Sequence, residues 1–228
     1  HSVFDPRKKG LFIASDVTSR YTRRSEEEYY KIAAYLHNII CQREGNYMAF
    51  FPSHAFLQNV YEAFKNRFPE GAKVECLLQE DYMDEEGREA FLARFDEKAE
   101  KSLLGFCVLG GIFGEGIDLK NDKLIGAVIV GTGLPQVCGE REILRKYFDE
   151  KGDNGFDFAY KYPGMNKVLQ AAGRVIRTAE DIGIVVLLDE RFLHSSYKSM
   201  FPREWEDFEI VSSSRIGKRV ERFWDEWL

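Results

Sequence analysis

The chain has 228 residues, 44% of them hydrophobic and 14% aromatic, so it can bury the core of one large domain or two small ones. Its net charge of −6 excludes a general attraction to nucleic acids or anionic membranes, so any such contact has to be local. There is no apolar run of membrane-spanning length, no visible signal peptide and no C-x-x-C pair among the four cysteines, so we expect a cytoplasmic protein with no metal or iron–sulfur site in this chain.

Strand-like apolar runs alternate with helical patterns along the chain. We expect strands at 11–15, 46–51, 73–78, 103–109, 124–130 and 182–189. Helices are expected at 25–42, 53–68, 84–95 and 140–150, the first opened by the capping box Ser25-x-x-Glu28 and the second capped by Ser53. This alternation predicts an α/β fold with a mostly parallel sheet and helices on both faces. We expect one domain over 1–228, in which 131–166 forms an excursion above the sheet with one helix.

Residues 170–177 read QAAGRVIR and place two arginines on one predicted helix face. At about 100° per residue, Gln170, Gly173, Arg174 and Arg177 share that face. The opposite, core-facing stripe holds Val168, Leu169, Ala172, Val175 and Ile176. Paired guanidinium groups suit bidentate recognition of phosphate or carboxylate, although an ordinary solvated face would look the same.

A glycine-rich run, GGIFGEGIDL, begins at Gly110 directly after an expected strand. Its glycines have the spacing of a P-loop, but Ile117 stands where a P-loop needs lysine, and G-x-G-x-x-G occurs nowhere in the chain. The run is therefore either a structural turn or a tight loop that delivers Glu115 and Asp118 to the carboxyl edge of the sheet. Ligands bind at that edge in parallel sheets.

Two further segments follow expected strands. Ser53 and His54 stand at a predicted helix N-terminus, where free N–H groups favour phosphate, although a simple N-cap explains them equally well. The run SRYTRR, which includes Arg20 and Arg23, suits a nucleic-acid backbone or an ordinary solvated loop. Asp189, at the end of the last expected strand, is interpreted as a cap of the loop that follows.

Together and in this order, these motifs resemble the second helicase lobe of the DinG/XPD-type DNA helicases of superfamily 2. QAAGRVIRTAEDIG is similar to motif VI of that family, GIFGEGIDL to motif V, AFFPSH to the motif IV position and LLDERF to the family's strand end. The resemblance covers essentially the whole chain. It implies a RecA-like three-layer αβα sandwich that works only when paired with a first lobe.

The resemblance also implies a role for each motif residue. Arg174 and Arg177 would be arginine fingers for ATP and Mg²⁺ held mainly by the first lobe, with Gln170 near the phosphates or the attacking water. The nucleotide cleft would include Glu115, Gly116, Asp118 and Gly173. The single-stranded DNA track would include Ser53, His54, Arg20 and Arg23.

By the same resemblance, the chain is the second motor lobe of an ATP-dependent DNA helicase that moves 5′ to 3′ as a monomer, with no membrane contact. The P-loop lysine and the D-E-x-H acids of the first lobe are not in this sequence, so we expect an excised C-terminal domain that is inactive alone. The parent protein could carry an iron–sulfur cluster outside this chain. The alternative is a non-catalytic RecA-like module that binds nucleic acid or a partner. A stand-alone kinase-like enzyme is disfavoured, because it would need a P-loop here.

Overall fold

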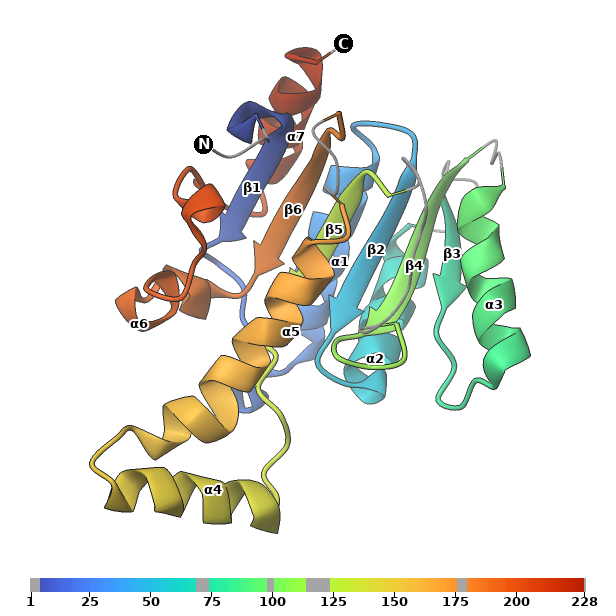
Figure 1. Ribbon diagram of the computed structural model, residues 1–228. Helices are drawn as coiled ribbons and strands as arrows, with labels where there is room; N and C mark the ends of the chain where they lie inside the picture. The colour runs from blue at the N-terminus through green and yellow to red at the C-terminus, as the bar shows by residue number, and fades with distance from the viewer. Residues whose placement is uncertain (1–4, 69–73, 98–100, 114–123, 176–179, 228) are drawn as a thin grey trace.

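The computed structural model describes residues 5–68, 74–97, 101–113, 124–175 and 180–227. In this part of the chain, seven parallel strands form one sheet in the order β3-β4-β2-β5-β6-β1-β7 (Figure 1). Their bounds are β1 Lys9–Ala14, β2 Asn46–Phe51, β3 Val74–Leu78, β4 Ser102–Val108, β5 Gly126–Val130, β6 Gly183–Leu188 and β7 Glu209–Val211. The six predicted strands are confirmed. The short edge strand β7 was not predicted, because it has only three residues and only one of them is buried.

Helices cover both faces of the sheet and make three layers (Figure 1). The helices α1, α2 and α7 contribute to the core on one face, and α3 and α5 to the core on the other. The bounds are α1 Glu26–Ile40, α2 His54–Arg67, α3 Glu85–Ala93, α4 Gly139–Glu150, α5 Tyr162–Ala172, α6 Ser195–Lys198 and α7 Ile216–Asp225. Short 3-10 helices cover Pro6–Lys8, Tyr21–Arg23, Arg94–Asp96, Glu190–Leu193 and Arg203–Trp205, and a π-helical turn, η4, covers Asp157–Lys161.

The central strands are buried on both sides, which explains their continuous apolar sequences. In β1, Phe12 and Ala14 join the core beneath α1 and α2, whereas Leu11 and Ile13 join the core beneath α5. Successive side chains of a strand point to opposite faces, so every residue of such a strand has to be apolar.

The predicted caps form, with one difference. The hydroxyl oxygens of Ser25 and Ser53 accept hydrogen bonds from the N–H groups of Glu28 and Phe56, each at 3.2 Å. No hydrogen bond from Ser25 N–H to the carboxylate of Glu28, which would complete a capping box, is found among the described contacts. That carboxylate instead accepts from the N–H of Thr18 at 3.2 Å. Glu28 therefore ties α1 to the segment after β1.

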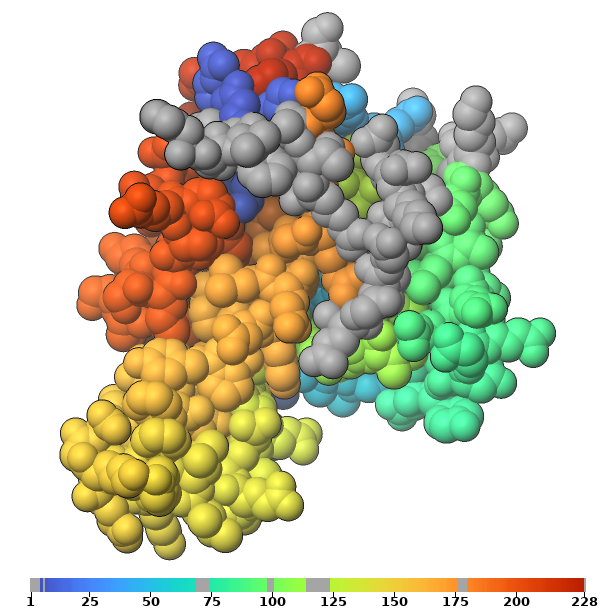
Figure 2. All heavy atoms as spheres, viewed as in Figure 1, coloured from blue at the N-terminus to red at the C-terminus, as the bar shows by residue number. Residues whose placement is uncertain are grey.

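The segment after β5 forms a helical hairpin that stands away from the sheet (Figures 1 and 2). Its first arm is α4, in which no residue is buried, and its second arm is η4, which runs directly into α5. The arms meet through the stacked rings of Phe148 and Phe158, 4.1 Å apart, and through the Tyr160 hydroxyl, 2.6 Å from Glu142. The predicted helix at 140–150 is confirmed as α4, and the hairpin places it beyond the carboxyl edge of the sheet.

Candidate functional site

Loops from four strands converge at the carboxyl edge of the sheet. A Cβ on Gly131, just after β5, would lie 2.5 Å from the Ser19 hydroxyl and 3.2 Å from Pro52. Ser19 follows β1 and Pro52 follows β2, so both loops lie against the end of β5. The backbone N–H and the hydroxyl of Ser19 donate to Asp189, at the end of β6, each at 2.9 Å.

Asp189 organises this edge. Its side chain is fully buried and accepts from Ser19 and from the N–H, Nε and Nη2 of Arg191 at 2.8 to 3.0 Å. Burial raises the pKa of Asp189, but the donors of Arg191 and Ser19 outweigh burial and hold it below its ordinary value. The predicted capping role of Asp189 is confirmed, and the bridge to Ser19 adds a long-range contact.

The arginine-rich segment lies beside the N-terminus of α2. Arg24 fixes it there, because its Nε donates to the Ser19 carbonyl at 3.1 Å and its guanidinium lies 5.0 Å from the Phe56 ring. The side chain of Arg20 is exposed, and that of Arg23 is 58% exposed and 3.9 Å from Glu28. The contact with α2 is thus made by Arg24, whereas the described ion pair of Arg23 is with Glu28 of α1. The sequence placed Arg24 in the same cluster but gave no sign of its anchoring role.

Ser53 and His54 begin α2 at the same edge. The Ser53 hydroxyl caps the helix, which confirms the structural interpretation of this residue, and its own proton stays available for donation. His54 is partly exposed, with Nδ1 at 3.7 Å from Asp81. The helix dipole places partial positive charge at this terminus, beside the arginines of the preceding segment.

The QAAGRVIR segment differs from its prediction. Helix α5 ends at Ala172, with Gly173 as its C-cap, so the expected helix does not continue to Arg177. Gln170 and Gly173 are exposed as predicted, but Arg174 is 8% exposed and does not lie on a solvent face. The reason is the helix end: Gly173, Arg174 and Val175 lie in a turn, so the exposed face of α5 cannot be extrapolated to Arg174.

The buried Arg174 influences Cys107, a core residue of β4. Burial raises the pKa of the Cys107 thiol, and the positive charge of Arg174 opposes that effect. On α5 itself, the aliphatic part of Lys167 packs on Gly110, whose added Cβ would lie 2.6 Å from Lys167 Cδ. Lys167 is three residues before Gln170, so helical spacing alone could have identified it as part of this face, but the sequence interpretation missed it.

Other predicted site residues are not described. Glu115, Gly116 and Asp118 lie outside the described residues, as does Arg177. The loop that precedes Glu115 lies on the face of the sheet that carries α3, because the ring of the buried Phe113 stacks on that of Phe91 at 4.5 Å.

The cysteines in the described ranges are free thiols, and the buried Cys107 packs as the small hydrophobe that its sequence predicted. Within those ranges, no group of three or more His, Cys, Asp or Glu side chains could hold a metal ion. None of the described helices is long and apolar enough to cross a membrane.

Known proteins share both the sequence pattern and the fold. A family model of the helicase C-terminal domain matches residues 36–208. The chain is 25% identical to a probable ATP-dependent helicase of Methanocaldococcus jannaschii, over 95% of this chain and 34% of that protein. It is 32% identical to the ATP-dependent DNA helicase XPD of Sulfolobus acidocaldarius, over 79% of this chain and 31% of that protein. A solved structure of apo XPD superposes with a TM-score of 0.70 and 25% identity, over 90% of this chain and 40% of that one.

These comparisons confirm the expected RecA-like α/β fold and the resemblance to DinG/XPD-type lobes. The chain spans about a third of the length of the curated relatives it matches. The family match extends from α1 past β6 and the end of α6, and so includes the arginine-bearing segment after α5. The chain belongs to the helicase C-terminal domain family, in the form found in helicases of the XPD and DinG type.

Proposed function

We propose that this chain is the second motor lobe of an ATP-dependent DNA helicase, which hydrolyses ATP between two RecA-like lobes and moves along single-stranded DNA from 5′ to 3′. The observation that carries the proposal is the family match together with QAAGRVIR at the end of α5. The relatives are named as ATP-dependent helicases, and the chain corresponds to about a third of each. The remaining two thirds would supply the first lobe and its P-loop.

The nucleotide side of the proposal rests on the end of α5. Gln170 is exposed there, and Arg174 is buried, with a charge that acts to lower the pKa of the Cys107 thiol in β4. In phosphoryl transfer, negative charge spreads over the equatorial phosphate oxygens, and ATP–Mg²⁺ on the first lobe would supply the transferable phosphoryl group. A guanidinium fixed by its surroundings stabilises that charge without reorganising. Arg177 would be the second such group, and Glu115, Gly116, Asp118 and Gly173 would border the same cleft.

The DNA side rests on the carboxyl edge. Arg20 and Arg23 are exposed in the segment that Arg24 joins to Phe56 of α2, the helix that Ser53 and His54 begin. Arginine side chains and a helix N-terminus both bind phosphates, and such contacts carry no sequence information. A few local donors are compatible with a net charge of −6, because backbone binding needs only a short basic track.

The decisive experiment uses the full-length parent protein. We expect Arg177→Ala and Arg174→Ala to lower DNA-stimulated ATP turnover by about 10³-fold or more, as loss of an arginine finger does. Single-stranded DNA affinity without nucleotide should stay within about twofold of wild type, because these residues are not on the DNA track. Arg222→Ala, an exposed arginine on α7, is the matched control and should turn over normally. Wild-type turnover by Arg177→Ala would refute the finger assignment.

The alternative is a non-catalytic RecA-like binding module. It predicts a parent protein without a P-loop and D-E-x-H segment, so the upstream coding sequence decides between the two.

A further inference from the structure

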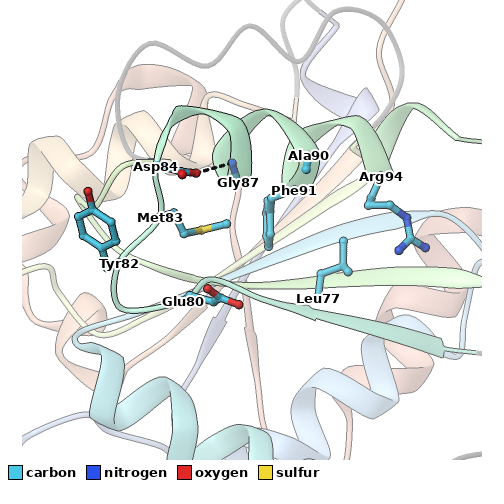
Figure 3. A pocket seen from close by; sticks show the side chains of 9 residues that line it. All are labelled: Leu77, Glu80, Tyr82, Met83, Asp84, Gly87, Ala90, Phe91 and Arg94. Atoms are coloured by element: carbon cyan, nitrogen blue, oxygen red, sulfur yellow. Dashed lines mark hydrogen bonds between the residues drawn. The ribbon is translucent and has the colours of Figure 1, made fainter.

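A pocket of about 490 Å³ lies between α3 and the end of β3 (Figure 3). Figure 3 shows Met83, Phe91 and Leu77 pointing into the space between the helix and the strand, with Tyr82 at one end and Arg94 at the other. The full lining is Leu77, Glu80, Tyr82, Met83, Asp84, Gly87, Ala90, Phe91 and Arg94.

The floor of this pocket, hereafter the α3 pocket, is firm and apolar. Phe91 is 6% exposed and stacks on Phe113 at 4.5 Å, and Phe95 lies 5.7 Å from it. Phe91 also belongs to the core cluster beneath α3 and α5. An apolar side chain entering the pocket would therefore contact preformed core surface. At the mouth, the Tyr82 ring is 84% exposed, so an aromatic group is available to cover such a side chain.

The rim of the α3 pocket is acidic. Its cation, Arg94, is engaged by Glu75 at 2.6 Å and by Glu97 at 3.1 Å, and the nearby Arg88 lies 3.7 Å from Glu85. Those contacts neutralise the local positive charge. Two exposed carboxylates line the pocket, Glu80 and Asp84, and among the described contacts neither forms an ion pair.

We propose that the α3 pocket is a docking site for a basic segment of a partner protein, which inserts one apolar or aromatic side chain and places Lys or Arg residues on the rim. Interfaces are anchored by buried side chains of this kind, and complementary charge selects the partner and speeds its association. A nucleic-acid base could fill the same volume, but its phosphates would lie against the rim carboxylates. Charge thus favours a cationic peptide over DNA.

The test uses the 228-residue chain and a panel of fluorescent heptapeptides with the pattern Arg-Lys-Ala-X-Ala-Lys-Arg, where X is Trp, Phe, Leu or Met. Fluorescence anisotropy should detect saturable binding of at least one peptide below about 1 mM. Replacing X by Ser, or the basic residues by Glu, should weaken that binding about tenfold or more, because each change removes one half of the recognition.

Two variants locate the site. Ala90→Phe fills the pocket from an exposed helical position, and Glu80→Lys reverses one rim charge, so each should weaken peptide binding at least about fivefold. Glu221→Lys, an exposed acid on α7, should bind as wild type does. Near-native far-ultraviolet circular dichroism of Ala90→Phe would confirm that the variant folds.

Failure of every peptide to bind, or unchanged binding by both variants, would overturn the proposal. So would a single-stranded oligonucleotide whose binding is lost in Ala90→Phe, because that result would assign the pocket to a base. None of these outcomes tests the proposed arginine fingers, since Ala90 and Glu80 are not residues of the nucleotide site.

Discussion

Asp189 is a carboxylate with no exposed surface that nevertheless stays ionised. It accepts hydrogen bonds from the backbone and side chain of both Ser19 and Arg191, and Arg191 is its ion-pair partner at 2.8 Å. A buried charge is tolerated only when it is paired and its lone pairs are satisfied, and here both conditions hold. The side chain thereby locks the loop after β1 to the end of β6, beside the segment that carries Arg20 and Arg23.

We expect Asp189→Asn to lower the free energy of unfolding by about 3 kcal/mol at neutral pH, because it leaves the Arg191 charge without its counter-ion. The folded pKa of Asp189 lies below its unfolded pKa of about 4. The stabilisation by its charge is therefore complete above the unfolded pKa and is lost as pH falls through the folded pKa. Urea denaturation at several pH values would measure both effects. The difference between wild type and variant should shrink below about pH 4.

The matched control for that variant is Asp225→Asn, which removes an exposed carboxylate from α7. It should change stability by less than about 0.5 kcal/mol. Equal losses in the two variants would contradict the bridging role of Asp189.

At the scale of elements, two helix starts set the geometry of the proposed sites. Helix α2 begins with Ser53 as its cap, at the edge where DNA would bind. Helix α5 begins against β5, where Gly164 and Gly133 touch. An added Cβ on Gly164 would lie 2.7 Å from the Thr132 carbonyl, and one on Gly133, where φ is +70°, would lie 2.4 Å from the Gly164 carbonyl. Side chains are excluded from both positions, so this contact fixes how α5 leaves the hairpin.

Substitutions at Ser53 separate its capping role from its proposed contact with DNA. Ser53→Ala should cost about 1 kcal/mol of stability through loss of the cap. Ser53→Asp preserves the cap but places negative charge on the proposed track, so stability should hold while single-stranded DNA affinity of the parent falls about fivefold or more. Ser199→Asp, after α6, is the control for added charge. If Ser53→Asp bound single-stranded DNA as tightly as wild type, Ser53 would act only as a helix cap and would not contact DNA.

Gly164→Ala tests the contact between α5 and the end of β5. Because the new Cβ would meet backbone atoms that cannot rotate away, we expect a loss of about 2 kcal/mol in the free energy of unfolding. Gly139→Ala, at the start of α4, has no atom within 4 Å of its Cβ and should be nearly neutral. Denaturant midpoints at constant slope would compare them. A neutral Gly164→Ala would show that α5 can shift without cost.

At the scale of the whole molecule, the proposed function requires two lobes, and this chain would supply only one side of the ATPase site between them. No P-loop lysine is present in this sequence, so the chain alone should release phosphate from ATP at the background rate, with or without single-stranded DNA. A phosphate-release assay would measure this, with Arg174→Ala as the control for contaminating ATPases. ATP hydrolysis by the wild-type chain that is absent from Arg174→Ala would contradict this prediction, because it would show that the chain alone contains a complete ATPase site.

The sequence predicted most of the architecture and part of the site. The six main strands, α1 to α4 and the caps at Ser25 and Ser53 are confirmed, because each depends on apolar periodicity or on a donor within a few residues. The prediction that Arg174 is exposed was wrong. A helical wheel assumes that the helix continues through Arg174, whereas α5 ends at Ala172. The functional roles of Gln170, Arg174 and Arg177 stay predictions.

By itself, the sequence determined the parallel α/β fold, its family and the motif residues, since these depend on short-range patterns that repeat along the chain. Only the tertiary structure decided which distant residues meet. The Ser19 hydroxyl donates to Asp189, 170 residues away. Among the described contacts, the Glu28 carboxylate accepts a hydrogen bond from the Thr18 N–H and not from the N–H of its own helix cap. The acidic α3 pocket likewise exists only because α3 packs against β3. Hydrogen-bond partners and cavities depend on how the elements pack across the sheet. No local sequence pattern specifies which loops meet at the carboxyl edge of that sheet.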